Sequence, residues 1–307
     1  MDWNKAIQYA NLVNAAYSKF ENKPYATPGF VEAGTIFGND LATRLNPTRG
    51  NNRVIIGLIL QAQGTGDVVV AFRGTEGIKE WVQDVQFGTM PFAPVPGSGQ
   101  TEDGFTAMYL SMRVDSQPNA PDVVSALQGI LGNRAATSLT VCGHSLGGAL
   151  ATLFAMDVAA NAPSTFNSLA VYTYASPRTG DRDFVAKYTQ LVSTTNRFVD
   201  NVDLVPQLPP DPPYQHVVAR LVLDSLTLIP PRVRLQPNPV CWHILSSYVY
   251  LLSLTSGGAV IPPEAECAPG IGVLVRDILG QVEAELGNQQ QIKDAFTASP
   301  RTNMGGN

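Results

Sequence analysis

The five residues 143–147 read Gly-His-Ser-Leu-Gly, so Ser145 lies between two glycines in the pattern Gly-x-Ser-x-Gly. Residues 139–142 before it are typical of a short buried strand, and residues 148–153 after it are typical of a helix. In a strand–turn–helix of this kind the residues on either side of the serine crowd together, and glycine removes the clash. The helix N-terminus beside the serine would favour a developing oxyanion. The pattern predicts that Ser145 is a nucleophile; an ordinary glycine-rich turn is the alternative.

A serine hydroxyl needs a neighbouring base, and the chain has three histidines, His144, His216 and His243. His144 adjoins Ser145 in the tight turn, so we expect its ring to point away, as a packed or hydrogen-bonded turn residue. His216 and His243 both follow the serine, as the order Ser…Asp…His requires. His243 lies between an irregular segment and a helix, which suits a base, whereas His216 is expected to begin a strand. The pattern favours His243 over His216.

The acid that orients this base is expected at the end of a strand that precedes the histidine. Asp203 stands just past a predicted strand at residues 195–199 and before a Val-Pro pair. Asp200 is closer to that strand, which favours a capping or turn role, and Asp224 is a third candidate. The residues alone favour Asp203 and leave the other two open.

Composition narrows the class of protein. The chain has 307 residues, of which 44% are hydrophobic and 15% charged, which is enough apolar material for a sizeable core. The net charge is −5 and there is no basic run, so we expect no nucleic-acid partner. Three cysteines do not make a disulfide framework. We expect free buried thiols, with a Cys241–Cys267 bridge as the alternative.

The first residues lack the charged-then-apolar pattern of a signal peptide. Apolar residues instead recur at helical spacing and predict an amphipathic helix: Trp3, Ile7, Ala10, Val13 and Tyr17. The apolar run at residues 244–254 is too short to span a bilayer, so no transmembrane segment is expected. We expect a soluble protein that is either intracellular or the mature form of a secreted one.

Strand and helix patterns alternate along most of the chain. Strands are predicted at residues 54–60, 68–72, 138–142, 169–175, 195–199 and 217–223. Helices are predicted at residues 105–112, 122–131, 146–160, 181–190, from 244, and at 273–286. This alternation predicts an α/β fold with a mostly parallel central sheet flanked by helices. We expect one domain over residues 1–307, with a helix and loop at 1–52 and a C-terminal extension of unknown role at 255–307.

Several motifs, in order, resemble the class 3 lipase family, which includes the triacylglycerol lipases of filamentous fungi. The resemblance covers roughly residues 54–252. The matching segments are residues 70–75 with Trp81 and Asp84, residues 103–106, the serine motif, residues 172–178, the acid motif at 203–210 and the histidine motif at 241–248. Ala175 replaces a common family glycine, and about fifty residues follow the histidine motif, more than in the fungal enzymes.

The resemblance implies an α/β-hydrolase fold and a triad of Ser145, Asp203 and His243. It selects Asp203 over Asp200, and His216 resembles a non-catalytic family histidine. It also implies an oxyanion hole made by the backbone N–H of Leu146 and by Thr75, through its N–H and hydroxyl. The implied chemistry needs no cofactor and no metal.

The expected activity is that of a serine carboxylester hydrolase, similar to triacylglycerol lipases. It would cleave acylglycerol or similar lipid esters through an acyl-enzyme, with transient contact to a lipid interface. Alternatives are a non-lipolytic esterase acting on feruloyl or short-chain esters, and a catalytically silent interaction module with the same fold. Residues 76–87 are either a mobile lid or a fixed surface helix. The apolar face of this segment would be Ile78, Trp81, Val82 and Val85.

Overall fold

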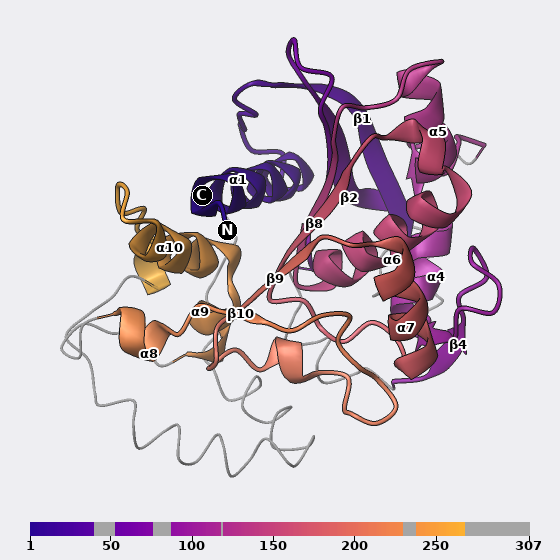
Figure 1. Ribbon diagram of the computed structural model, residues 1–307. Helices are drawn as coiled ribbons and strands as arrows, with labels where there is room; N and C mark the ends of the chain where they lie inside the picture. The colour runs from indigo at the N-terminus through magenta and orange to yellow at the C-terminus, as the bar shows by residue number, and fades with distance from the viewer. Residues whose placement is uncertain (40–52, 76–86, 118, 230–237, 268–307) are drawn as a thin grey trace.

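The computed structural model describes residues 1–39, 53–75, 87–117, 119–229 and 238–267, which form one large sheet with helices on both faces (Figure 1). The sheet has the strand order β10-β9-β8-β7-β3-β2-β1-β6. Its strands are β1 (Phe30–Asn39), β2 (Arg53–Ala62), β3 (Val68–Phe72), β6 (Arg113–Val114), β7 (Leu139–His144), β8 (Leu169–Tyr174), β9 (Thr195–Val199) and β10 (Leu221–Val222). A separate hairpin consists of β4 (Thr89–Pro91) and β5 (Gln100–Glu102).

Strand direction divides the sheet into two parts. The adjacent pairs β3–β7, β7–β8, β8–β9 and β9–β10 are parallel. The pairs β3–β2, β2–β1 and β1–β6 are antiparallel. The prediction of an α/β fold with a mostly parallel sheet is therefore confirmed. Because β3, β7, β8 and β9 are parallel, the segments that follow them meet at one edge, and Thr75, Ser145 and Asp203 all follow these strands.

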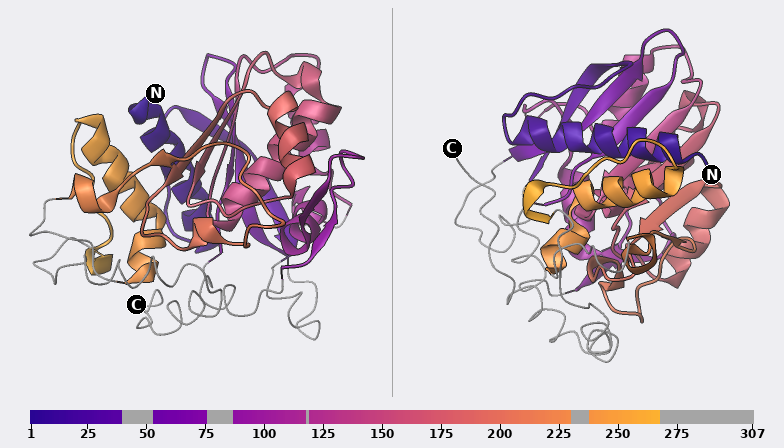
Figure 2. Two further views of the ribbon diagram at one scale, coloured as in Figure 1. Left: turned by 60° about the horizontal axis from the view of Figure 1, so that its bottom comes forward. Right: turned by 90° about the vertical axis from the view of Figure 1, so that its left-hand side faces the viewer.

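Helices cover the two faces of the sheet unequally. The helices are α1 (Trp3–Phe20), α4 (Asp103–Ser111), α5 (Val123–Leu131), α6 (Leu146–Asn161), α7 (Arg182–Leu191), α8 (Ser225–Leu228), α9 (Pro239–His243) and α10 (Leu245–Ser256). The core of one face contains side chains of α4, α5, α6 and α7. The core of the other contains side chains of α1 and α10, which lie side by side (Figure 2). α6 is apolar nearly all round because it is buried between the sheet and its neighbouring helices.

The prediction of a helix followed only by a loop over residues 1–52 is wrong at residues 30–39, where β1 forms. This strand contains two glycines, and its register with β2 shifts between Glu32 and Gly34 and again between Ile36 and Phe37. These shifts interrupt the two-residue alternation by which a half-buried strand is predicted from sequence. Pairing with the apolar strand β2, rather than local pattern, therefore determines the structure of this segment.

The strand predicted at residues 217–223 is reduced to the two residues of β10. The residues before it make other bonds: Gln215 N–H donates to the Gly180 carbonyl at 2.8 Å, and the Val218 carbonyl accepts from Arg197 Nε at 3.1 Å. The Val218 carbonyl is therefore bonded to a side chain of β9 and not to a strand backbone, so the ladder with β9 begins only at Leu221. The predicted lid residues Ile78, Trp81, Val82 and Val85 and the predicted helix at 273–286 lie outside the described residues.

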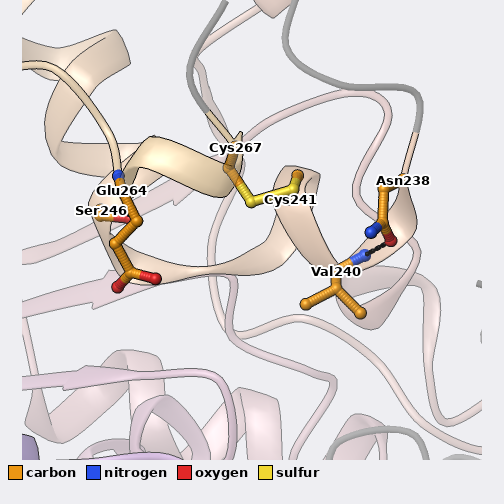
Figure 3. Close-up of a disulfide and its surroundings, with 6 residues drawn as sticks. All are labelled: Asn238, Val240, Cys241, Ser246, Glu264 and Cys267. Carbon is orange, nitrogen blue, oxygen red and sulfur yellow. Dashed lines mark hydrogen bonds between the residues drawn. A yellow bond between two sulfur atoms is a disulfide. The ribbon is translucent and has the colours of Figure 1, made fainter. Parts of the chain in front are cut away.

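A disulfide joins Cys241 to Cys267, so the expectation of free thiols is wrong for this pair (Figure 3). After α10 the chain turns back along the helix, and Glu264 N–H donates to Ser246 Oγ at 3.4 Å. This return brings the two Cα atoms to 5.2 Å, within the normal range for a disulfide. Cys142, in contrast, is a free buried thiol, as expected. No helix in the described part of the chain is both long and apolar enough to cross a membrane.

Removal of the disulfide is predicted to destabilise the fold. The bond closes a loop between residues separated by 26 positions. Opening such a loop raises the conformational entropy of the unfolded chain, which lowers its free energy by about 3 kcal/mol at room temperature. The double variant Cys241→Ser, Cys267→Ser should show a free energy of unfolding lower by about that amount in urea titration. Reductant should lower the wild-type value to that of the variant and leave the variant unchanged. Equal stability of wild type and variant without reductant would contradict this account.

Candidate active site

Ser145 occupies a sharp turn between β7 and α6. Its backbone φ of 55° lies in the left-handed region, which residues other than glycine rarely adopt. Its N–H donates to the Tyr174 carbonyl at 2.9 Å. A Cβ at Gly143 would lie 2.0 Å from the Gly147 carbonyl oxygen, and a Cβ at Gly147 would lie 2.4 Å from the Phe72 carbonyl oxygen. The two glycines are therefore required by close backbone contacts, as the sequence predicted.

Ser145, His243 and Asp203 form one hydrogen-bonded chain. His243 Nε2 lies 2.8 Å from Ser145 Oγ, and His243 Nδ1 lies 2.9 Å from Asp203 Oδ2. The carboxylate can only accept, so Nδ1–H donates to Asp203, and Nε2 accepts from the serine hydroxyl. The three residues are 1%, 3% and 1% exposed, respectively, so these bonds are shielded from water. The structure thus brings together three predicted site residues that lie 98 and 40 positions apart.

Short capped elements fix the base and the acid. His243 is the last residue of α9, whose first turn is capped by the Asn238 side chain, which accepts from Val240 N–H at 3.0 Å (Figure 3). Asp203 lies in the turn after β9, where its N–H donates to the Asp200 carbonyl at 3.1 Å. Asp203 Oδ1 also accepts from Val205 N–H at 3.0 Å. Backbone contacts therefore orient both side chains before any substrate binds.

Tyr248 is a site residue for which the sequence analysis predicted no role. Its hydroxyl donates to Asp203 Oδ2 at 2.7 Å and accepts from Asp200 N–H at 3.1 Å. Tyr248 lies inside the histidine motif at 241–248, but a buried aromatic residue on an apolar helix is ordinarily read as core. The hydrogen bond to Asp203 depends on how α10 packs against the β9 turn, which the local sequence does not contain.

The residues that the sequence offered as alternatives for the acid and the base, Asp200, Asp224 and His216, bond to groups outside the triad. Asp200 is buried, and its Oδ1 accepts from Ser225 N–H at 3.1 Å. Asp224 caps α8, where it accepts from Leu226 N–H. His216 Nε2 donates to the Pro206 carbonyl at 2.8 Å, and burial together with the charge of Arg197 lowers its pKa to about 3, so it is neutral.

The predicted oxyanion residues lie at the same edge of the sheet. Leu146 is the first residue of α6, and the amides of a helix's first turn have no acceptor within the helix. Thr75 is partly buried and follows β3 by three residues. A cavity opens beside the triad at this edge. It is lined by Asn14, Tyr17, Glu21, Thr75, His144, Val240, His243, Ile244, Leu245, Ser246 and Glu264.

The loop that carries Thr75 is anchored to its surroundings through Arg73 and Gly74. Arg73 Nε donates to the Ile55 carbonyl at 2.6 Å, and the guanidinium carbon lies 3.6 Å from the centre of the Phe20 ring. Gly74 N–H donates to the Tyr17 hydroxyl at 2.8 Å. α1 therefore holds the segment that leads into Thr75.

The chain shows similarity to plant enzymes and to solved fungal lipases. It is 34% identical over 227 residues to phospholipase A1-II 6 of Oryza sativa subsp. japonica, a match of 64% of this chain and 53% of that protein. It is 32% identical over 212 residues to phospholipase A1-IIgamma of Arabidopsis thaliana, a match of 63% of this chain and 50% of that protein. The chain thus spans about half the length of these plant relatives. A crystal structure of a lipase from Rhizopus microsporus var. chinensis superposes with a TM-score of 0.56 at 23% identity, covering 72% of this chain and 74% of that one.

The order of the sheet, the serine turn and these structural matches define an α/β-hydrolase fold with a Ser–His–Asp arrangement at the carboxyl edge. The family model described as lipase (class 3) matches residues 69–212. This segment covers slightly less than half of the chain and contains Ser145 and Asp203, and over it the chain is similar to class 3 lipases.

The serine turn should not tolerate a side chain at its first glycine. Gly143→Ala is predicted to cost more than about 3 kcal/mol of stability, because the new Cβ would meet backbone that cannot move away cheaply. Gly129→Ala is the matched control: Gly129 is exposed in α5 and its Cβ would meet nothing within 4 Å. That change should stabilise the protein by up to about 1 kcal/mol. Thermal and urea unfolding of both variants test this, and an unaltered Gly143→Ala protein would contradict the described turn.

Asp200 should make stability depend on pH. Burial raises the pKa of Asp200 from 3.8 to about 7, so between these values the folded protein holds a proton that the unfolded chain releases. Stability contributed by this group therefore falls as pH rises from about 4 to about 7 and then levels off. Asp200→Asn keeps the shape and removes the titration. The difference in unfolding free energy, wild type minus variant, should decrease across this window; a constant difference would show that Asp200 does not titrate there.

Proposed function

We propose that this protein hydrolyses carboxylic esters of lipids, with Ser145 as nucleophile, His243 as general base and Asp203 as the acid that orients it. The observation that carries the proposal is the uninterrupted hydrogen-bond chain from Ser145 Oγ through His243 to Asp203, with its two links at 2.8 and 2.9 Å. Serine becomes nucleophilic when an adjacent base accepts its proton, and this geometry supplies that base.

The proposed reaction has two acyl-transfer steps. Ser145 Oγ attacks the ester carbonyl carbon while its proton passes to His243 Nε2, and Asp203 stabilises the resulting imidazolium. The tetrahedral intermediate then expels the alcohol, which takes the proton from His243. Water next attacks the acyl-enzyme with His243 again as base, and the carboxylic acid leaves as the serine regains its proton.

Negative charge develops on the substrate oxygen in both steps. We assign its stabilisation to the backbone N–H of Leu146, at the positive end of α6, and to Thr75 at the end of the neighbouring strand. The support is their position: β3 and β7 are adjacent parallel strands, so the segment with Thr75 and the segment with Ser145 and Leu146 meet at the same edge of the sheet. Gly74, next to Thr75, lies so close to the serine turn that an added Cβ would be 2.9 Å from Ser145 Cβ.

A lipid ester is the substrate class that the relatives support. The plant relatives are named phospholipase A1, and one solved structural match is a triacylglycerol lipase with a serine-protease triad. Phospholipids and acylglycerols share a fatty acyl ester, which is the bond that the proposed site would cleave. Transient contact with a lipid surface follows from this proposal, because such substrates reside in aggregates.

We also propose that the chain is a single domain. The site contains residues from helices on both faces of the one sheet, Tyr17 of α1 and Leu146 of α6.

Ester hydrolysis should depend on Ser145 and should not depend on His216. Ser145→Ala should lower kcat by at least about 10⁴-fold with little change in stability, because only the nucleophile is lost. His216→Ala is the control and should retain activity, since His216 bonds the Pro206 carbonyl.

The substrates for this test are p-nitrophenyl esters of two to eighteen carbons, phosphatidylcholine vesicles, emulsified triglyceride and a feruloyl ester. Hydrolysis of the long-chain and lipid substrates supports the proposal. Hydrolysis of only feruloyl or short-chain esters would replace it with a non-lipolytic esterase, and no turnover at all would indicate a silent module.

A further inference from the structure

A second hydrogen-bond chain runs beside the triad and involves none of its side chains. Gly74 N–H donates to the Tyr17 hydroxyl at 2.8 Å, and that hydroxyl lies 2.9 Å from His144 Nδ1. The other ring nitrogen, His144 Nε2, lies 2.7 Å from the backbone carbonyl oxygen of His243. One tyrosine and one histidine therefore connect α1, the loop before Thr75, the serine turn and the backbone of the proposed base.

The direction of each bond in this chain is fixed by chemistry. The His243 carbonyl can only accept, so His144 Nε2 must carry a proton and donate it. Burial, together with the nearby His243, lowers the pKa of His144 well below its ordinary value, so the ring is neutral and Nδ1 has no proton. Nδ1 must then accept from the Tyr17 hydroxyl, and the tyrosine oxygen accepts from Gly74 N–H. Aligned bonds of this kind polarise and strengthen one another.

Close packing makes this chain rigid. A Cβ at Gly74 would lie 2.5 Å from the Tyr17 hydroxyl oxygen and 2.9 Å from Ser145 Cβ, so no atom can be inserted between these groups. The rings of His144 and His243 are 4.9 Å apart between centroids. His144 is itself buried, so water cannot readily replace its two partners.

We propose that Tyr17 and His144 are positioning residues that hold the Thr75 loop, the Ser145 turn and the His243 backbone in one fixed arrangement. The inference rests on the proposed function, because it assigns these residues to the same reaction. Neither residue touches the reacting atoms in the proposed mechanism. Their effect is on the relative placement of the oxyanion donor and the base, where a displacement of about 1 Å can cost on the order of a hundredfold in rate.

The first test compares two tyrosines on the same helix. Tyr17→Phe removes the hydroxyl that makes both bonds, and Tyr9→Phe removes a hydroxyl that accepts from Thr140 Oγ1 at 3.3 Å. We expect Tyr17→Phe to lower kcat for a p-nitrophenyl ester about tenfold to a hundredfold with KM nearly unchanged, and Tyr9→Phe to retain the wild-type kcat. Thermal melts of both variants separate loss of positioning from loss of fold. A folded Tyr17→Phe protein with kcat within twofold of Tyr9→Phe would overturn the proposal.

A double-mutant cycle tests whether the two residues act as a unit. His144→Phe keeps a ring in place and removes both of its hydrogen bonds. If Tyr17 and His144 form one bridge, the double variant should lose little more kcat than the more damaged single variant. If the losses multiply, the residues act independently and the proposed bridge is wrong.

The wild-type protein provides a readout that does not depend on variants or on activity. The ¹⁵N NMR signals of His144 should show a protonated Nε2 and an unprotonated, hydrogen-bonded Nδ1. A protonated Nδ1 would overturn the direction of the chain and with it the proposal. Failure of the wild type to hydrolyse any ester would instead refute the proposed function, and the His144 signals would still decide whether the bridge exists.

Discussion

The structure depends on the crowded turn at Ser145. Gly143 and Gly147 approach so closely that a methyl group on Gly143 would overlap the Gly147 carbonyl, and Ser145 accepts a left-handed backbone between them. This strain is tolerated because β7 is the central parallel strand, with β3 and β8 on either side and α6 buried behind it. The turn places one hydroxyl at the carboxyl edge, at the start of a helix, where the loops after β3 and β9 also end. The positions of Thr75 and Asp203 follow from that geometry.

Burial at this edge is matched by hydrogen bonding. Asp203 accepts from His243, from the Tyr248 hydroxyl and from Val205 N–H, so a carboxylate that is almost fully buried has partners on both oxygens. Buried polar groups cost free energy unless they are paired, and a paired network is rigid. The same reasoning applies to His144, which lies beside the triad without joining it. The site is therefore held by two parallel sets of bonds, one through the side chain of His243 and one through its backbone.

The sequence predicted those features that depend on local constraint. The glycine spacing around Ser145 is a steric requirement, the alternation of strands and helices gives a parallel sheet, and the motif order selects His243 and Asp203. It failed where long-range contacts decide the outcome. β1 forms by pairing with β2 despite two glycines and two register shifts. The pairing of Cys241 with Cys267 depends on how the chain returns along α10. Tyr17 was visible only as an apolar position on a helix, and Tyr248 only as a member of the histidine motif, because neither pattern identifies the partner of a hydroxyl.

The central claim is that Ser145 is activated by His243, and covalent labelling tests it most directly. The folded protein would be treated with a fluorophosphonate, digested and mapped by mass spectrometry, alongside the His243→Ala variant and protein unfolded in urea. The account predicts one adduct, on the peptide that contains Ser145, and at least about a thousandfold slower labelling in both comparison samples, because a serine without its base is a poor nucleophile. Labelling of another residue, or labelling of Ser145 at an equal rate without His243, would contradict it.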